Sequence, residues 1–188
     1  MPTALISVYD KTGLMPLAKG LLAQGWRLLA TGGTLRALQE AKLEAQEVAA
    51  YTGAPECFDG RVKTLHPRIH GGLLYRRDLP EHVKDAKAQG IEPIDLVVIN
   101  LYPFEATIAR EGVTAAEAIE QIDIGGPSMI RSASKNHASV TVLTSPDQYD
   151  PFLHKLKAGA WGLEDRRRCA LEAFRRTWPE SLAVAPRF

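Results

Sequence analysis

The sequence has little cysteine, no long hydrophobic run and no excess of charge of either sign. Its 188 residues include two cysteines, Cys57 and Cys169, which form no CxxC pattern. Two isolated cysteines exclude a disulfide framework and fit a reducing compartment. No segment approaches the ~18 apolar residues that cross a bilayer, and the amino terminus has no basic stretch followed by an apolar one. We therefore expect a cytoplasmic protein without a membrane partner.

The balance of charges and the absence of several motifs exclude further classes. Lys and Arg number 23 and Asp and Glu number 22, which gives a formal net charge of +1. The chain therefore has no overall basic field that would attract nucleic acid. It also has no GxSxG, no Walker motif and no complete GxGxxG, so serine-hydrolase, P-loop and dinucleotide-binding sites have no support. Recognition of an anion must be local.

Short apolar runs alternate with amphipathic stretches along the chain, which is typical of βαβ units. The pattern predicts an α/β fold, a three-layer sandwich in which helices flank a mostly parallel sheet. Strands are expected at 4–8, 26–30, 44–48, 94–101 and 138–143. Helices are expected at 14–24, 35–41, 81–89, within 104–121, and at 127–136, 146–157 and 163–177.

The segment 49–79 has no such periodicity and is expected to be a long irregular loop, a feature that is more often functional than accidental. From residue 60 to residue 77 it contains five Lys and Arg residues and no Asp or Glu. An anionic ligand would be attracted to such a stretch. A solvated basic loop is the alternative that charge alone leaves open.

Polar residues follow the first two apolar runs, at the sheet edge where open α/β folds bind ligands. These residues are Tyr9, Asp10 and Lys11 after the first run and Thr31, Gly32, Gly33 and Thr34 after the second. Glycines let the backbone approach a ligand, and the free N–H groups of a helix start favour a phosphate. Backbone geometry alone is the other explanation of a Gly-Gly turn.

Asn100 and Tyr102 end the fourth run, and Asp123 precedes a Gly-Gly-Pro turn that begins a helix. Asn and Tyr at a strand end could bind a heteroaromatic ligand, or be a turn residue and a half-buried aromatic. The N–H groups of residues 124–126 are expected to be free to hold an oxyanion. Asp123 and Lys135 would form a proton relay if they met across a pocket. Asp123 could instead be only a hydrogen-bond acceptor at the helix start.

The histidines do not predict a metal site. His66 and His70 lie four residues apart, but Pro67 argues against a shared helical face, and no third ligand has the spacing of a metal site. His137 follows Asn136 at an expected helix end, where a structural role is the default. We expect no metal.

Six strings, taken together, resemble one known family: ISVYDKTG, ATGGT, GRVKTLHP, NLYPF, QIDIGG and SKNHASVTVL. From about Ala4 to Arg176, the sequence resembles the IMP cyclohydrolase domain of the bifunctional enzyme AICAR transformylase/IMP cyclohydrolase. The resemblance implies a methylglyoxal-synthase-like α/β fold and the last step of de novo purine biosynthesis. There, 5-formamidoimidazole-4-carboxamide ribotide (FAICAR) closes to inosine monophosphate (IMP) with loss of water. The implied enzyme is a hydrolase of a cyclic amidine C–N bond that runs toward ring closure, without a cofactor.

The resemblance also implies roles for individual residues. Lys63 would stabilise negative charge on the formyl oxygen, with help from the backbone N–H groups at 124–125. Lys135 would donate or accept a proton, paired with Asp123, and Tyr102 would assist proton transfer or positioning. The ribotide would be bound by Tyr9, Asp10, Lys11, Thr31, Gly32, Gly33, Thr34, Arg61, Val62, Thr64, Asn100, Ile124, Gly125 and Gly126.

The sequence departs from the family pattern in three places. Tyr9 stands where the family usually has Ser, the ending TWPESLAVAPRF does not resemble the family's continuation, and the transformylase half is absent. We expect residues 1–188 to form a single cyclohydrolase domain with a helical extension from about 146, to form homodimers, and to transfer no formyl group. Any transformylase would be a separate partner. Methylglyoxal synthase and a non-catalytic nucleotide-binding regulatory module are the alternative functions.

Overall fold

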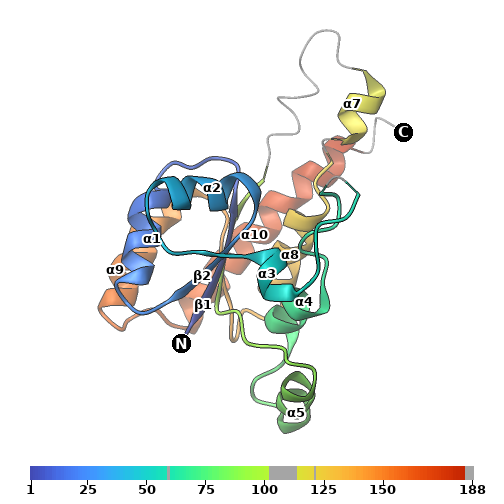
Figure 1. Ribbon diagram of the computed structural model, residues 1–188. Helices are drawn as coiled ribbons and strands as arrows, with labels where there is room; N and C mark the ends of the chain where they lie inside the picture. The colour runs from blue at the N-terminus through green and yellow to red at the C-terminus, as the bar shows by residue number, and fades with distance from the viewer. Residues whose placement is uncertain (59, 102–113, 121, 185–188) are drawn as a thin grey trace.

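The centre of the molecule is a parallel β-sheet. The computed structural model describes residues 1–58, 60–101, 114–120 and 122–184. Within them the sheet has five parallel strands in the order β3-β2-β1-β4-β5 (Figure 1). The strands are β1 Thr3–Val8, β2 Arg27–Ala30, β3 Gln46–Glu47, β4 Leu96–Asn100 and β5 Thr141–Leu143. The prediction of an α/β sandwich built on a parallel sheet is confirmed.

Strand β1 is central because its side chains are apolar on both faces, as a strand covered by helices on each side requires. Leu5 is fully buried and pairs with Leu29 of β2 on one side and Val97 of β4 on the other. The chain runs from β1 outward to β2 and β3, and then returns to add β4 and β5 on the other side. This reversal opens a crevice beyond the carboxyl ends of β1 and β4, where folds of this kind bind ligands.

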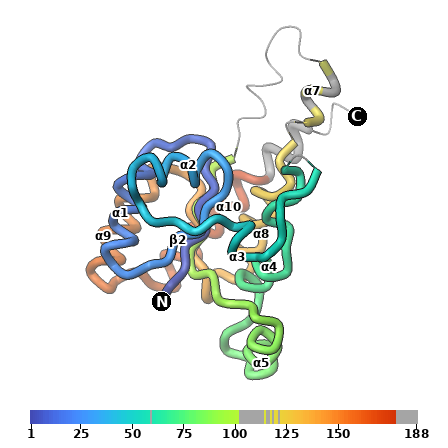
Figure 2. Tube along the Cα trace, in the orientation of Figure 1, coloured from blue at the N-terminus to red at the C-terminus, as the bar shows by residue number. Residues whose placement is uncertain are grey.

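Helices cover both faces of the sheet. In Figure 1, α1 and α9 lie on one side, while α8 and α10 lie on the other and pack against each other and against β5. Helix α5 projects from the body of the molecule. The tube in Figure 2 follows the course of the chain, with α1 and α9 close together and α5 at the far end of the molecule. The helices are α1 Leu14–Leu22, α2 Gly32–Glu40, α3 Val48–Thr52, α4 Pro67–Leu74, α5 Pro80–Ala88, α7 Ala115–Glu120, α8 Gly125–Lys135, α9 Tyr149–Lys157 and α10 Leu163–Val184, with a 3-10 turn at Pro146–Gln148.

The helices after residue 146 complete the two helical layers. Phe152 of α9 is buried, and its ring meets Trp26 and Trp161 edge to face, at centroid distances of 6.5 and 4.8 Å. Leu153 packs so closely on Gly20 of α1 that a methyl group on Gly20 would lie 2.8 Å from it. Both contacts remove apolar surface from water, so α9 contributes to the core of the sandwich.

The expectation of an irregular loop over 49–79 is wrong, because this segment contains α3 and α4. Helix α4 begins at Pro67, in the first helical position, where its missing N–H costs nothing. His66 caps this helix by accepting a hydrogen bond from the Arg68 amide, with 3.1 Å between Nδ1 and N. Pro67 therefore begins a helix here, although proline in the interior of a helix would interrupt it.

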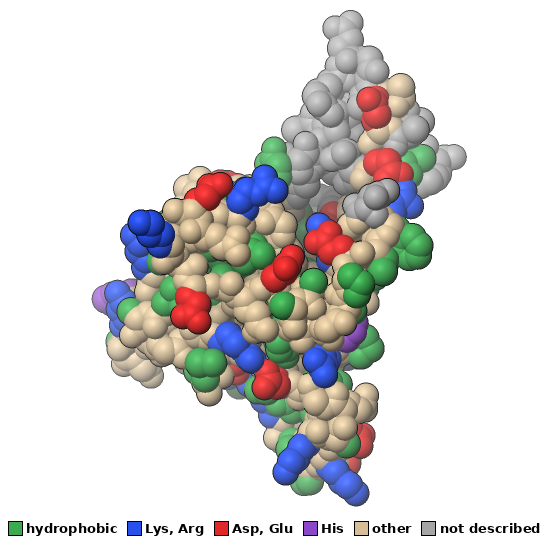
Figure 3. All heavy atoms as spheres, viewed as in Figure 1, with side chains coloured by type: hydrophobic (Ala, Val, Ile, Leu, Met, Phe, Trp, Pro, Cys, Tyr) green, Lys and Arg blue, Asp and Glu red, His purple; other side chains and the backbone are tan. Residues whose placement is uncertain are grey.

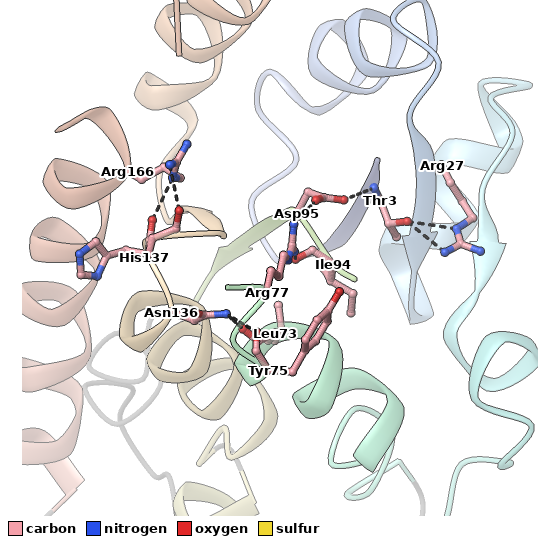
Figure 4. A network of polar contacts seen from close by, with 11 residues as sticks. Thr3, Arg27, Leu73, Tyr75, Arg77, Ile94, Asp95, Asn136, His137 and Arg166 are labelled. Carbon is pink, nitrogen blue, oxygen red and sulfur yellow. Dashed lines mark hydrogen bonds and ion pairs between the residues drawn. The ribbon is translucent and has the colours of Figure 1, made fainter. Parts of the chain in front are cut away.

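A polar network ties together the amino-terminal ends of three neighbouring strands (Figure 4). Asp95, just before β4, accepts hydrogen bonds from the Thr3 amide at 2.7 Å and from Arg77 Nη1 at 2.6 Å. Arg77 also donates to the carbonyl oxygen of Ile94 at 2.9 Å. Arg27, at the start of β2, donates to Thr3 Oγ1 at 3.0 Å. The strand starts are thus fixed relative to one another on the edge opposite the crevice.

The SKNH string contributes to packing between helices. Asn136 is buried, and its Nδ2 donates to the carbonyl oxygens of Leu73 and Tyr75 at 2.8 and 3.1 Å (Figure 4). These bonds satisfy carbonyl groups at the carboxyl end of α4, which have no partner within the helix. Arg166 of α10 donates to the carbonyl oxygen of His137 at 2.9 Å. The end of α8 is therefore joined to α4 and α10.

His70 makes the stability of this helical layer depend on pH. Its Nδ1 lies 3.0 Å from Ser132 Oγ, and its Nε2 is buried without a hydrogen-bond partner among the described residues. Burial lowers the pKa of His70 below its ordinary value, because a buried imidazolium loses hydration. The unfolded chain then binds a proton that the folded chain does not. The free energy of unfolding should therefore decrease as the pH falls below about 6.5, through the interval between the two pKa values.

Chemical denaturation of the wild type and of His70→Gln between about pH 5 and pH 8 measures this effect. The wild type should lose more stability toward acid than the variant does. Equal losses in both proteins would contradict the assignment.

The surface carries charges of both signs. On the face in Figure 3, Lys and Arg side chains are interspersed with Asp and Glu side chains, in keeping with the balanced composition. No helix in the described part of the chain is long and apolar enough to cross a membrane.

Candidate functional site

A pocket of about 710 Å³ lies at the carboxyl edge of the sheet. The ends of β1 and β2, the starts of α2 and α8, the segment 60–65 and α7 surround it. It is lined by Ser7, Thr31, Gly60, Arg61, Lys63, Thr64, Leu65, Ile119, Glu120, Ile122, Asp123, Ile124, Gly125, Gly126 and Met129. The predicted residues Thr31, Arg61, Lys63, Thr64, Asp123, Ile124, Gly125 and Gly126 are thus brought together, although they come from distant parts of the chain.

Lys63 is held at this pocket by a small hairpin. Cys57 and Val62 form an antiparallel pair, with N–O distances of 3.1 and 3.3 Å between their backbones. In an antiparallel pair the next residues outward face each other, so Glu56 comes opposite Lys63. Their side chains form an ion pair with 2.9 Å between Nζ and Oε2. The Lys63 side chain runs across Gly60, whose φ of 88° favours glycine.

The start of α2 forms a second wall that is suited to an anion. Thr31 is the N-cap, and its Oγ1 lies 3.3 Å from Ser7 Oγ. Gly32 has a φ of 49°, and a methyl group on it would lie 3.9 Å from Lys63 Nζ. A methyl group on Gly33 would lie 3.8 Å from Lys11 Nζ. Two ammonium groups therefore lie near free N–H groups at the positive end of a helix, an arrangement that favours phosphate.

The start of α8 forms the third wall. Asp123 Oδ1 accepts a hydrogen bond from the Gly126 amide at 2.9 Å, so Asp123 satisfies a donor at the helix start. The expectation that the Gly126 N–H is free for an oxyanion is therefore wrong in this structure. A methyl group on Gly126 would collide with the Asp123 carboxylate, and one on Gly125 would lie 2.8 Å from Thr64 Oγ1. Both glycines allow polar side chains to approach the helix closely.

Asn100 organises the loop after β1. Its Oδ1 accepts hydrogen bonds from the amides of Tyr9 and Asp10 at 2.7 and 2.9 Å, and its Nδ2 donates to the Asp10 carbonyl oxygen at 2.7 Å. Asp10 in turn accepts a hydrogen bond from the Thr12 amide at 2.8 Å, and the bonds to Thr12 lower the pKa of the Asp10 carboxyl. Asn100 thus joins the ends of β1 and β4, while Tyr9, Asp10 and Lys11 are exposed beside the pocket.

Thr34 and Val62 do not line the pocket. Thr34 is buried, and its Oγ1 is bonded to the backbone of Val8, with 2.9 Å to the amide and 3.1 Å to the carbonyl oxygen. These bonds fix the first turn of α2 against β1. Val62 contributes its backbone to the hairpin that orients Lys63.

The structure does not bring Lys135 to Asp123. Lys135 is exposed and is the last residue of α8, whereas Asp123 lies just before the helix begins. Lys135 comes ten positions after Gly125, which corresponds to about 15 Å along a helix. Tyr102 lies outside the described residues.

The basic stretch 60–77 is only partly directed at the pocket. Arg61 and Lys63 line it, whereas Arg77 pairs with Asp95 at the opposite edge of the sheet and Arg76 pairs with Asp78 on the surface. Charge counting along the sequence could not separate these groups, because their carboxylate partners lie outside the stretch.

Several lining residues were not predicted from the sequence. Ser7 lies within an apolar strand, and Met129 has the spacing of a core position on α8, so neither carried a signal for function. Glu56 could be associated with Lys63 only once the hairpin register was known. No group of three or more His, Cys, Asp or Glu residues that could hold a metal ion occurs in the part of the chain that the structure describes.

Comparison with known proteins agrees with this architecture. The family model of the MGS-like domain matches residues 13–128 of the sequence, and the family model of the AICARFT/IMPCHase bienzyme matches residues 133–186. The bifunctional purine biosynthesis protein PurH of Synechococcus sp. (strain WH7803) is 59% identical over 186 residues, which cover 97% of this chain and 35% of that protein. PurH of Leuconostoc mesenteroides is 55% identical over 177 residues, 94% of this chain and 35% of that protein.

A solved structure is similar over nearly its whole length. The crystal structure of ForH superimposes with a TM-score of 0.89 at 38% sequence identity, and the match covers 98% of this chain and 95% of ForH.

The sheet, its helical layers and the first family model define the class: the chain belongs to the MGS-like domain family. Within this class its sequence is similar to the PurH proteins of purine biosynthesis, and the match is consistent with their IMP cyclohydrolase domain. The resemblance seen in the sequence is confirmed. The chain spans about a third of the length of the curated PurH relatives, 35% in the two cases above.

Proposed function

We propose that the chain is an IMP cyclohydrolase that closes FAICAR to IMP with loss of water. The observation that carries this proposal is the meeting of Lys63, Asp123 and the start of α2 around one pocket. A ring closure of this kind needs a cation for a developing oxyanion, a group that exchanges protons and a site for the ribotide phosphate.

The substrate would be bound by its phosphate at the start of α2. Backbone N–H groups at Gly32 and Gly33 and the Lys11 ammonium supply positive potential there. Thr31 lines both this site and the pocket, so the heterocycle would extend from the phosphate toward α8. Holding both ends of one molecule would keep its carboxamide and formyl groups in contact, which accounts for much of the acceleration of an intramolecular reaction.

The chemistry would proceed in two stages. The carboxamide nitrogen attacks the formyl carbon, and Lys63 stabilises the negative charge that develops on the formyl oxygen. The nitrogen proton is transferred to a carboxylate, for which Asp123 is the candidate at the pocket wall. The alkoxide takes a proton from Lys63 and becomes a hydroxyl. That hydroxyl leaves as water with the proton held by Asp123, while the formamide nitrogen forms the C=N bond and returns its own proton to Lys63. No step requires an oxidant, a reductant or a metal.

The activity is tested by mixing the purified chain with FAICAR and following IMP by its ultraviolet absorbance. Formation of IMP above the uncatalysed rate supports the proposal. Nucleotide binding without ring closure would indicate a regulatory module instead.

Lys135 is proposed as a proton-transfer group on the resemblance alone. Its position at the far end of α8 implies a particular arrangement of two copies of the chain. At about 15 Å from the start of α8, it can reach Asp123 only from a second copy of the chain. The expected homodimer would then have sites in which Lys63 and Lys135 come from different copies.

This arrangement predicts that Lys63→Ala and Lys135→Ala are each inactive, and that an equimolar mixture after subunit exchange regains about a quarter of the wild-type activity, because half of the dimers then hold one intact site of two. Sedimentation should show a dimer in all three samples. A mixture that stays inactive, despite proven exchange, would exclude the shared site.

A further inference from the structure

Both cations that line the described pocket are paired with carboxylates. Lys63 Nζ lies 2.9 Å from Glu56 Oε2, and Arg61 pairs with Glu120. Asp123 adds a third carboxylate to the same pocket. The lining residues and their direct partners therefore carry two positive and three negative formal charges, although the start of α2 favours an anion.

The pair of Lys63 and Glu56 is fixed by the backbone. The Cys57–Val62 register places the two side chains opposite each other. Gly60 gives them room, since a methyl group there would lie 2.7 Å from Lys63 Cε and 3.3 Å from Glu56 Oε2. The side chains are 32% and 39% exposed, so solvent does not fully screen the Glu56 charge from a ligand at Lys63. Glu56 is thus a fixed negative charge close to the start of α2, because Lys63 Nζ is near both, 2.9 Å from Glu56 Oε2 and 3.9 Å from a methyl group placed on Gly32.

We infer that Glu56 determines specificity by charge: it limits the pocket to phosphates of low charge, such as a nucleoside monophosphate, and disfavours polyphosphates. This inference rests on the proposed function, in which the pocket takes a ribotide that carries one phosphate. A ligand phosphate gains from Lys11 and from the start of α2, and it loses to the nearby Glu56 in proportion to its own charge. Each further phosphate adds repulsion from Glu56 without gaining a further lining cation among the described residues.

The size of the effect follows from Coulomb's law. Over about 6 Å in water, removal of one negative charge strengthens binding about threefold for each negative charge on the ligand. Glu56→Gln should therefore tighten binding of inorganic phosphate about tenfold at low ionic strength, and binding of inorganic tripolyphosphate by more, up to about a hundredfold, because its further charges lie farther from Glu56. The ratio of the two affinities should change by up to about tenfold in favour of tripolyphosphate.

Isothermal titration calorimetry of the full chain with these two ions measures that ratio without any turnover. Glu81→Gln, on the distant helix α5, makes the same change in net charge and should leave both affinities within about twofold. Glu56→Asp keeps the negative charge, so its ratio of affinities for the two ions should equal that of the wild type. Thermal unfolding of each variant shows whether the fold is intact.

Equal tightening for both ions, or a change no larger than that in Glu81→Gln, would overturn the inference. These outcomes are separate from the test of ring closure. A wild-type chain that does not form IMP but shows the charge-dependent shift in Glu56→Gln would refute the proposed reaction and keep the role of Glu56. A chain that forms IMP but shows no such shift in Glu56→Gln would support the proposed reaction and refute the role of Glu56.

Discussion

Replacement of Lys63 by alanine is expected to lower kcat for ring closure by about a hundredfold to a thousandfold, the usual loss when one donor to a developing oxyanion is removed. Among the described residues, the Lys63 ammonium is the cation nearest Gly32 at the start of α2, and it lines the pocket that also contains Asp123. The charge that it would stabilise is present in the transition state and absent from the neutral formyl group. The loss should therefore appear mainly in kcat.

The matched control is Lys87→Ala on α5, which removes the same charge from a site remote from the pocket and should leave kcat unchanged. Stopped-flow absorbance of IMP formation, with thermal unfolding of both variants, makes the comparison. If Lys63→Ala closed the ring at the wild-type rate while keeping its fold, the assignment of the oxyanion site would be wrong.

Asp95→Ala should have the largest effect on stability, a decrease of about 3 kcal/mol in the free energy of unfolding. The carboxylate accepts from the Thr3 amide and from Arg77, and the side chains of Asp95 and Arg77 are only 22% and 27% exposed. Removal would leave the Thr3 N–H, in a residue that is 1% exposed, without its acceptor. It would also leave the Arg77 guanidinium half-buried without its anion.

Asp78→Ala is the control for this prediction. Asp78 pairs with Arg76 where both side chains are more than half exposed, so its removal should change stability by no more than about 0.5 kcal/mol. Urea denaturation of the three proteins at neutral pH gives the comparison. Similar losses for Asp78→Ala and Asp95→Ala would show that the network at the strand starts contributes no more than an exposed ion pair does.

Most of the sheet could be predicted from the sequence because β1, β2, β4 and β5 lie in short apolar runs, whereas β3 consists of the exposed polar residues Gln46 and Glu47. Helix α4 could not, because the interior residues Gly71 and Gly72 give it little helix propensity, and its formation depends on packing against α8. Tertiary contacts outweighed local preference there.

The turn at Thr31 and the helix start at 124–126 were predicted from the residues to favour an anion, whereas the roles of Arg61, Lys63 and Thr64 came from the family resemblance. The structure brings these segments together around one pocket. Individual roles were harder to predict. Thr34 and Asn100 have the polarity of ligand-binding residues but bond to neighbouring backbone, which no periodicity reveals. Glu56 lies outside the basic stretch, so only the hairpin register relates it to Lys63.

The two ends of the strands have different roles in the molecule. The ion pairs and hydrogen bonds around Asp95 secure the strand starts, whereas the pocket is assembled from loops and helix starts at the far ends of the same strands. Substitutions at the pocket can therefore accumulate without unfolding the scaffold, and the scaffold can vary without disturbing the pocket. This separation would allow the same sheet and helical layers to acquire new reactions during evolution through changes in the loops and helix starts at the pocket alone.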